Sequence, residues 1–118
     1  PADTDLLIVM LGTNDLLQGR SPEQAAEKLE RFLAVVPLER SKILLLAPPP
    51  VTLGAWVPSP QLIDESRAFA RLCQALAEQL DIRFADAGRW DIPLAYDGVH
   101  FAEQGHKAFA TRLLEELK

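Results

Sequence analysis

Blocks of apolar residues, separated by polar segments that contain glycine or proline, predict three β-strands. Residues 6–11 (LLIVML) form an uninterrupted apolar run, and residues 42–46 (KILLL) form a second run that soon meets three consecutive prolines. A shorter run, IRFA, occupies residues 82–85. Continuous apolar runs of this length are typical of strands covered on both faces in a parallel sheet, and a proline run cannot continue a central strand.

Helical periodicity fills the segments between and after these runs. The sequence SPEQ at residues 21–24 predicts a helix start, in which Ser21 is the N-cap and Gln24 closes a capping box. SP at residues 59–60 repeats the signal before a long helix, and residues 102–117 form a last helix. The apolar positions expected to face the core are Ala25, Leu29, Phe32, Val36, Leu62, Phe69, Leu72, Leu76, Leu80, Phe109, Leu113 and Leu117.

The order of these elements predicts the fold class. Strands that alternate with helices imply a parallel sheet with right-handed crossovers. We therefore expect an α/β fold, a flavodoxin-like three-layer α/β/α arrangement to which this chain supplies about three strands. Ligands bind beyond the carboxyl ends of the strands in such sheets, so residues 12–15, 48–56 and 86–100 should converge at one edge.

Composition removes several classes of function. The 118 residues allow one domain, and 48% hydrophobic with 25% charged residues suits a soluble globular protein. A net charge of −5 offers no basic footprint for nucleic acid or anionic lipid. The single cysteine, Cys73, excludes an internal disulfide and reads as core filling. No apolar run is long enough to insert in a membrane, no signal peptide is visible, and the compartment stays open.

Residues 97–100, Asp-Gly-Val-His, are the first candidate for chemistry. Asp97 precedes His100 by three residues across a glycine-bearing turn. A carboxylate in this position can accept the ring Nδ1–H, which fixes the tautomer and leaves Nε2 free as a base. An exposed loop pair, with Asp97 as a turn residue, is the competing interpretation.

Asn14 is the second candidate, because it follows the first predicted strand within the sequence Gly-Thr-Asn-Asp. A side-chain amide there can donate to a developing oxyanion, and one such donor is worth about 2.7–4 kcal/mol in acyl transfer. The competing interpretation is that Asn14 and Asp15 close a loop or cap a helix. An oxyanion donor and an oriented base on the same sheet edge are two parts of a serine-type acyl hydrolase.

Together these motifs resemble the SGNH, or GDSL, hydrolases. LGTNDLL at residues 11–17 resembles their block III (G-x-N-D), and DGVHFAEQGHKAFA at residues 97–110 resembles block V (D-x-x-H) running into the final helix. The proline loop at residues 47–50 and the following Trp56 resemble the arylesterase-like branch. The resemblance covers essentially the whole chain.

The resemblance implies a role for each matching residue. Asn14 matches the oxyanion-hole asparagine, His100 the catalytic base, and Asp97 the acidic partner of that histidine. Gly12 matches the block III glycine, which lets the loop pass tightly. Asp15 is interpreted as an organiser of the same loop.

Four more residues carry weaker expectations. Trp56 and Val99 are candidates for the substrate pocket, although Trp56 is equally explained as closing its loop. His106 is interpreted as a surface helix residue and Trp90 as packing. No metal site is expected, since two histidines alone are too few ligands, and no cofactor is implied.

The nucleophile of this family is not found in the chain. The family's serine lies in a Gly-Asp-Ser motif before block III, and this chain begins just before block III. The four serines fit poorly, because Ser21 and Ser59 suit helix caps, Ser66 lies inside a helix and Ser41 precedes a strand at its amino end. We therefore expect residues 1–118 to be the C-terminal portion of one SGNH-hydrolase domain, without its N-terminal strands and nucleophile segment.

The resulting hypothesis is an esterase-type hydrolase of small acyl esters, acting through an acyl-enzyme when joined to that segment. Its expected partners are the N-terminal fragment of the same hydrolase carrying Gly-Asp-Ser and a small-molecule ester, with homo-oligomers left open. The alternative is an inactive fragment, pseudo-enzyme or binding module of the same fold. A flavodoxin-like nucleotide-binding module is disfavoured because no glycine-rich phosphate loop follows any predicted strand.

Overall fold

The three predicted strands form one parallel sheet. The computed structural model describes residues 5–118, so residues 1–4 of the expected domain lie outside the described residues. β1 (Leu7–Val9), β2 (Ile43–Ala47) and β3 (Arg83–Asp86) are hydrogen-bonded in the order β1-β2-β3, with β2 in the middle.

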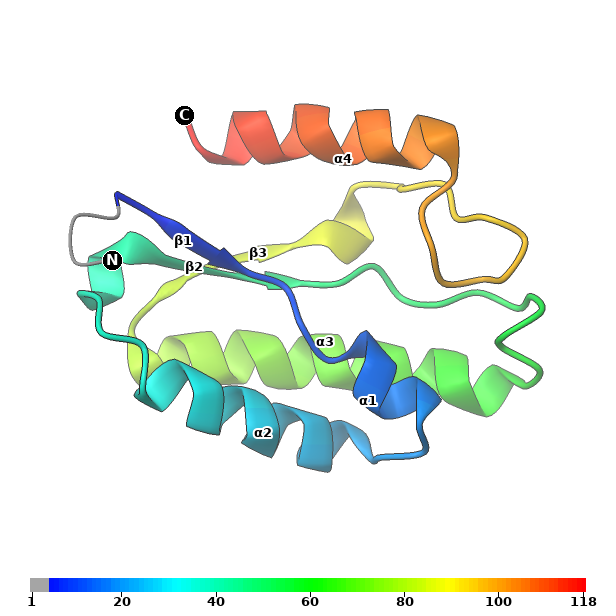
Figure 1. The fold of residues 1–118 in the computed structure, drawn as a ribbon, viewed down its shortest axis with the longest axis horizontal. Coiled ribbons are helices and arrows are strands. Elements are labelled where there is room, and N and C mark those ends of the chain that lie inside the picture. Colours follow the sequence, from blue (N-terminus) through cyan, green and yellow to red (C-terminus); the bar gives the residue numbers. More distant parts are fainter. Residues whose placement is uncertain (1–4) are drawn as a thin grey trace.

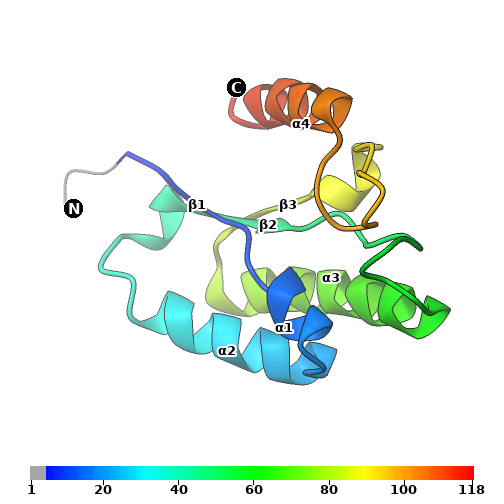
Figure 2. The same ribbon diagram turned by 45° about the vertical axis from the view of Figure 1, so that its right-hand side comes forward.

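Helices cover both faces of this sheet. α2 (Pro22–Ala34) and α3 (Pro60–Leu80) pack on one face, and α4 (Glu103–Glu116) lies on the other (Figures 1 and 2). The α/β/α layering and the parallel sheet are therefore confirmed. No helix within residues 5–118 combines the length and apolar character needed to cross a membrane.

β2 shows why a continuous apolar run is needed at the centre of the sheet. All five of its residues are buried. Leu45 and Ala47 belong to the core on the side of α2 and α3, whereas Leu44 and Leu46 belong to the core that α4 covers. Successive side chains of a strand point to opposite faces, so each layer takes alternate residues of one run.

The first strand differs from its prediction. Of residues 6–11, only Leu7–Val9 form a strand, and it is not covered on both faces, because Ile8 is 37% exposed and Leu11 is 50% exposed. The single helix on the Ile8 side, α4, packs over Leu44 and Leu46 of the neighbouring strand. β1 is thus an edge strand with an apolar outer side.

The segment after β1 is also different, because it is a short helix rather than a loop. α1 (Thr13–Leu17) begins directly after Gly12, whose φ is 121°. A Cβ at Gly12 would overlap the ring of Phe69 in α3. Gly12 therefore lets the chain turn sharply while it passes tightly over α3, as the sequence led us to expect.

The other elements follow the predictions with small shifts. Ser21 and Gln24 form the expected capping box, and the third strand is displaced by one residue. Ser59 is the N-cap of α3 without a side-chain bond. Phe32 and Leu117 were expected inside but are exposed. Two 3-10 turns, Arg40–Lys42 and Ala87–Arg89, flank the strands.

Candidate active site

The turn between β3 and α4 forms the Asp97–His100 pair. Asp97 Oδ2 lies 2.6 Å from Nδ1 of His100, and its Oδ1 accepts backbone N–H groups of Val99 and His100 at 2.8 and 2.9 Å. Gly98 has a φ of 81°, a left-handed conformation that other residues rarely adopt. The spacing of three residues across a glycine therefore produces the predicted contact.

Hydrogen bonds keep the buried carboxylate of Asp97 ionised. The Asp97 side chain is 8% exposed, whereas that of His100 is 62% exposed. The Val99 N–H and then the His100 ring hold the pKa of Asp97 below its ordinary value, against the opposing effect of burial. The carboxylate is thus ionised at neutral pH and only accepts, so Nδ1 of His100 carries the hydrogen and Nε2 is free.

Asn14, in α1, lines the same cavity as His100. It lies in the first turn of α1, where Gly12 is the N-cap and no side chain caps the helix, so capping α1 does not explain Asn14. One cavity of about 630 Å³ is lined by Asn14, His100 and Val99 together. The structure therefore brings together the two motifs that the sequence singled out.

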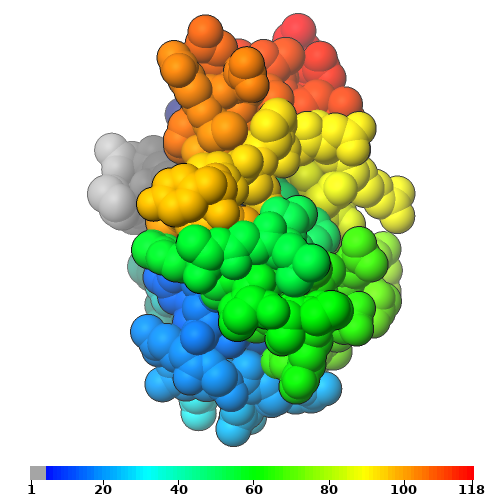
Figure 3. All heavy atoms as spheres, turned by 90° about the vertical axis from the view of Figure 1, so that its right-hand side faces the viewer, coloured from blue at the N-terminus to red at the C-terminus, as the bar shows by residue number. Residues whose placement is uncertain are grey.

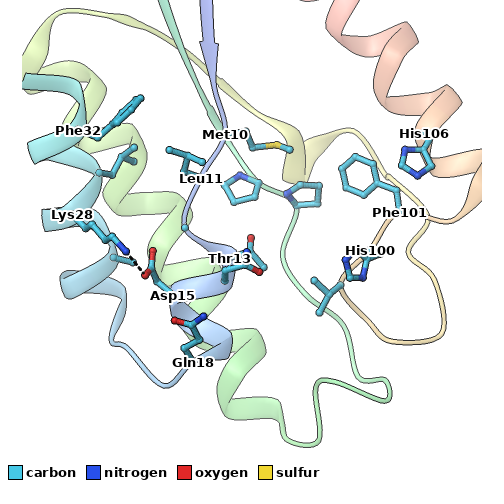
Figure 4. A pocket seen from close by; sticks show the side chains of 17 residues that line it. Met10, Leu11, Thr13, Asp15, Gln18, Lys28, Phe32, His100, Phe101 and His106 are labelled. Atoms are coloured by element: carbon cyan, nitrogen blue, oxygen red, sulfur yellow. Dashed lines mark hydrogen bonds and ion pairs between the residues drawn. The ribbon is translucent and has the colours of Figure 1, made fainter. Parts of the chain in front are cut away.

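The charged side chains lie on one side of this cavity, where Phe32 also lies, and the two histidines lie on the other. In Figure 4, Asp15 and Lys28 lie on one side, and His100, Phe101 and His106 lie on the other, with Thr13 between them. Asp15 pairs with Lys28 at 3.2 Å and with Arg20 at 3.1 Å. The pair with Lys28 joins α1 to α2, and the pair with Arg20 joins α1 to the segment between these helices.

The structure adds cavity residues that the sequence analysis had not assigned. His106 is exposed on α4 as expected, yet it lines the cavity and its ring lies 5.5 Å from that of Phe101. Pro48 and Pro49 line the cavity as well. The only sequence signal for His106 was its place in the turns after His100, which also fits an ordinary surface helix.

Trp56 lies against the histidine rather than among the residues that line this cavity. Its ring is 5.0 Å from that of His100, at an interplanar angle of 75°. Trp90 is buried against Phe109, with 5.5 Å between the ring centroids, which agrees with the packing role expected for it.

None of the four serines, all of which lie in the described residues, lines the cavity. Ser66 is buried in α3, where it accepts a hydrogen bond from Val51 N–H and donates to Ile63 O. Ser41 lies in the 3-10 turn at the amino end of β2, and Ser21 and Ser59 begin helices.

Metal ligation and thiol chemistry also find no support in the described part of the chain. Residues 5–118 contain no group of three or more histidine, cysteine or acidic side chains placed to hold a metal ion. Cys73 is buried in the core, and that burial raises the pKa of its thiol to about 12. An inert packing role follows for Cys73.

Comparisons with known proteins agree with this geometry. Residues 1–108 match the sequence profile of the GDSL-like Lipase/Acylhydrolase family. An aryl esterase from M. smegmatis is similar in structure, with a TM-score of 0.77, 29% identity, and coverage of 96% of this chain and 60% of its own. A carbohydrate acetylesterase family member from Sinorhizobium meliloti has a TM-score of 0.82, 26% identity, and coverage of 99% and 62%.

This chain thus spans about 60% of the length of the solved esterases that it resembles. A comparison with curated protein sequences found no match.

Proposed function

Because the chain belongs to the GDSL-like lipase/acylhydrolase family, we propose that it supplies the base, its acidic partner and one oxyanion donor of a serine esterase for small acyl esters. The observation that carries this proposal is the bonded Asp97–His100 pair, with Asn14 on the same cavity. The aryl esterase and carbohydrate acetylesterase among its structural relatives support ester hydrolysis as the reaction class.

In the proposed mechanism, a serine hydroxyl attacks the ester carbonyl while Nε2 of His100 takes its proton. Asp97 stabilises the imidazolium that forms, and the Asn14 amide donates to the tetrahedral oxyanion. His100 then gives the proton to the leaving alcohol, which leaves an acyl-serine. A water molecule then attacks the acyl-serine while His100 takes its proton, and His100 returns that proton to the serine oxygen as the carboxylic acid leaves.

We propose that the serine comes from a separate segment that pairs with the outer edge of β1. Two features of the structure support this. Within residues 5–118, β1 is the last strand on its side of the sheet and its Ile8 is 37% exposed, and the cavity continues from His100 past Met10 and Leu11 to the apolar side of α2. A parallel strand on this edge would end beside Asn14, because the carboxyl ends of parallel strands meet at one edge.

The test combines mass spectrometry with an esterase assay on the protein as it is purified. Denaturing intact-mass spectrometry gives the mass of every polypeptide before and after treatment with a fluorophosphonate that labels activated serines. Hydrolysis of p-nitrophenyl acetate is then measured for the wild type, His100→Gln and the control Lys107→Gln, which changes an exposed basic residue of α4 outside the cavity lining.

We expect the label on a Gly-Asp-Ser sequence outside residues 1–118, together with hydrolysis that is lost in His100→Gln and kept in Lys107→Gln. Labelling of any of the four serines of this chain would contradict the proposal. Equal hydrolysis by the wild type and His100→Gln would also contradict it. Absence of both label and hydrolysis would favour the inactive-fragment alternative.

A further inference from the structure

We propose that Trp56 is a positioning residue for His100, and that a glycine-mediated contact between two loops holds it there. The first loop, residues 51–57, follows β2, and the second, residues 95–98, precedes His100. The catalytic meaning of this placement rests on the function proposed above, whereas the placement itself does not.

The ring of His100 needs a second support. Its side chain is 62% exposed, and its hydrogen bond to Asp97 holds only the Nδ1 edge of the ring. The near-perpendicular contact with Trp56 restrains the rest of the ring, because the positive edge of one aromatic ring attracts the negative face of the other. The two contacts together fix where Nε2 points.

Trp56 is held through its backbone rather than through burial, because the residue as a whole is 54% exposed. Its N–H donates to the carbonyl of Asp97 at 3.0 Å, and Thr52 N–H donates to Gly98 O at 2.9 Å. The neighbouring Val57 is almost completely buried and anchors the end of the loop. The two residues whose side chains contact the His100 ring, Trp56 and Asp97, are therefore joined by a hydrogen bond between their main chains.

Two glycines allow the loops to approach this closely. A Cβ at Gly54 would lie 2.5 Å from the backbone carbon of Asp97 and 2.5 Å from the nitrogen of Gly98. A Cβ at Gly98 would overlap the carbonyl oxygen of Thr52. Figure 3 shows the first loop, in green, lying directly against the second loop, in yellow and orange. The loops thus form one unit that carries the indole, the carboxylate and the histidine.

A positioning role and a substrate-wall role for Trp56 make different kinetic predictions. A wall contacts bound ester before and during reaction, so its loss raises KM. A positioning residue acts on the direction of Nε2, which matters when the proton moves, so its loss lowers kcat. The position of Trp56 outside the residues that line the cavity favours the second role.

The first measurement does not depend on hydrolysis. Histidine-labelled protein, purified with any associated segment retained, gives ring carbon–proton NMR signals, and His106→Gln removes the other histidine signal of this chain. We expect Trp56→Ala to move the His100 signal and Trp56→Phe to return part of the shift. Leu53→Ala, which alters a 61% exposed residue of the same loop, should leave the His100 signal unchanged.

Gly54→Ala provides a second route to the same result, because it separates the loops without changing either ring. We expect it to move the His100 signal in the same direction as Trp56→Ala. A His100 signal that is unchanged in a folded Trp56→Ala protein overturns the proposal, whether or not the protein hydrolyses esters.

The kinetic measurement then tests the consequence for catalysis. We expect Trp56→Ala to lower kcat roughly tenfold, because misplacing a catalytic group slows the chemical step, with KM nearly unchanged and partial rescue by Trp56→Phe. An unchanged kcat with a raised KM would overturn the positioning role. If the wild type shows no hydrolysis, the proposed function has failed, and the NMR result still decides whether Trp56 positions His100.

Discussion

The two oxygens of Asp97 have different partners, which gives a single side chain two tasks. Oδ1 accepts the backbone N–H groups that close the turn, and Oδ2 accepts the ring of His100. Asp97→Asn replaces one oxygen with an N–H₂ group that cannot accept the Nδ1 hydrogen. We expect kcat for p-nitrophenyl acetate to fall by roughly 10³- to 10⁴-fold, because the wrong tautomer removes the free Nε2.

Asp91→Asn is the matched control for this measurement. Asp91 is exposed on the segment before the turn and has a φ of 53°, which asparagine tolerates. It should keep wild-type kcat. Wild-type activity in Asp97→Asn, or an equal loss in both variants, would contradict the role of Asp97.

The lowered pKa of Asp97 also predicts how stability depends on pH. Its ordinary value is 3.8, and hydrogen bonds from Val99 and His100 lower it in the folded protein. The unfolded chain therefore takes up the proton first as the pH falls, and the stabilisation present above 3.8 is lost as the pH drops through the folded pKa. Urea unfolding should show a wild-type advantage over Asp97→Asn at neutral pH that narrows below 3.8; a constant difference would contradict the assignment.

At this scale the sequence predicted a contact within one turn but not a contact between two loops. The spacing of Asp97, Gly98 and His100 is local, so a turn alone brings the pair together. The contact between Trp56 and His100 depends instead on how two separate loops meet at the sheet edge. Nothing in the residues around Trp56 specifies that meeting.

At the scale of elements, Gly12 couples the end of β1 to α3. Its φ is 121°, and any Cβ would overlap the ring of Phe69, which is fully buried. Gly12→Ala should lower the free energy of unfolding by about 2–4 kcal/mol, combining backbone strain with overpacking. Because Asn14 is two residues away, the same change should lower kcat.

Gly19→Ala separates backbone strain from overpacking as causes of the lower free energy of unfolding. Gly19 has a φ of 90° with open space around its Cα, so alanine there adds strain without overlap. Urea unfolding should show a cost of about 1–2 kcal/mol for Gly19→Ala. Equal costs at the two glycines would contradict the close packing assigned to Gly12 and Phe69.

Element types were predictable where capping and periodicity agreed, and less so where tertiary context decided. The capping box at Ser21 and Gln24 set the start of α2 correctly. α1 was missed because its five residues are too few to show a helical period. Phe32 fits the apolar spacing of α2, but Leu33 is the residue that packs in the core.

For the whole molecule, the order of strands and helices specified the layers but not how completely they cover the sheet. A continuous apolar run signals two covered faces, and β2 has them. β1 carries the same signal, and Leu6 and Met10 pack against the core on the α4 side, yet Ile8 between them is 37% exposed. We propose that the serine-bearing segment packs at this exposed position.

That proposal makes a prediction for a single exposed position. If a strand pairs with the edge of β1, Ile8→Asp places a charge in the contact and should weaken it by about 2 kcal/mol, or roughly thirtyfold in affinity. Leu114→Asp changes an exposed leucine on α4 and serves as the matched control. Size-exclusion chromatography detects the loss where the segment is a separate polypeptide, and a lower Tm detects it where the segment is joined. Equal behaviour of Ile8→Asp and Leu114→Asp would mean that nothing pairs with β1 and that the serine reaches His100 by another route.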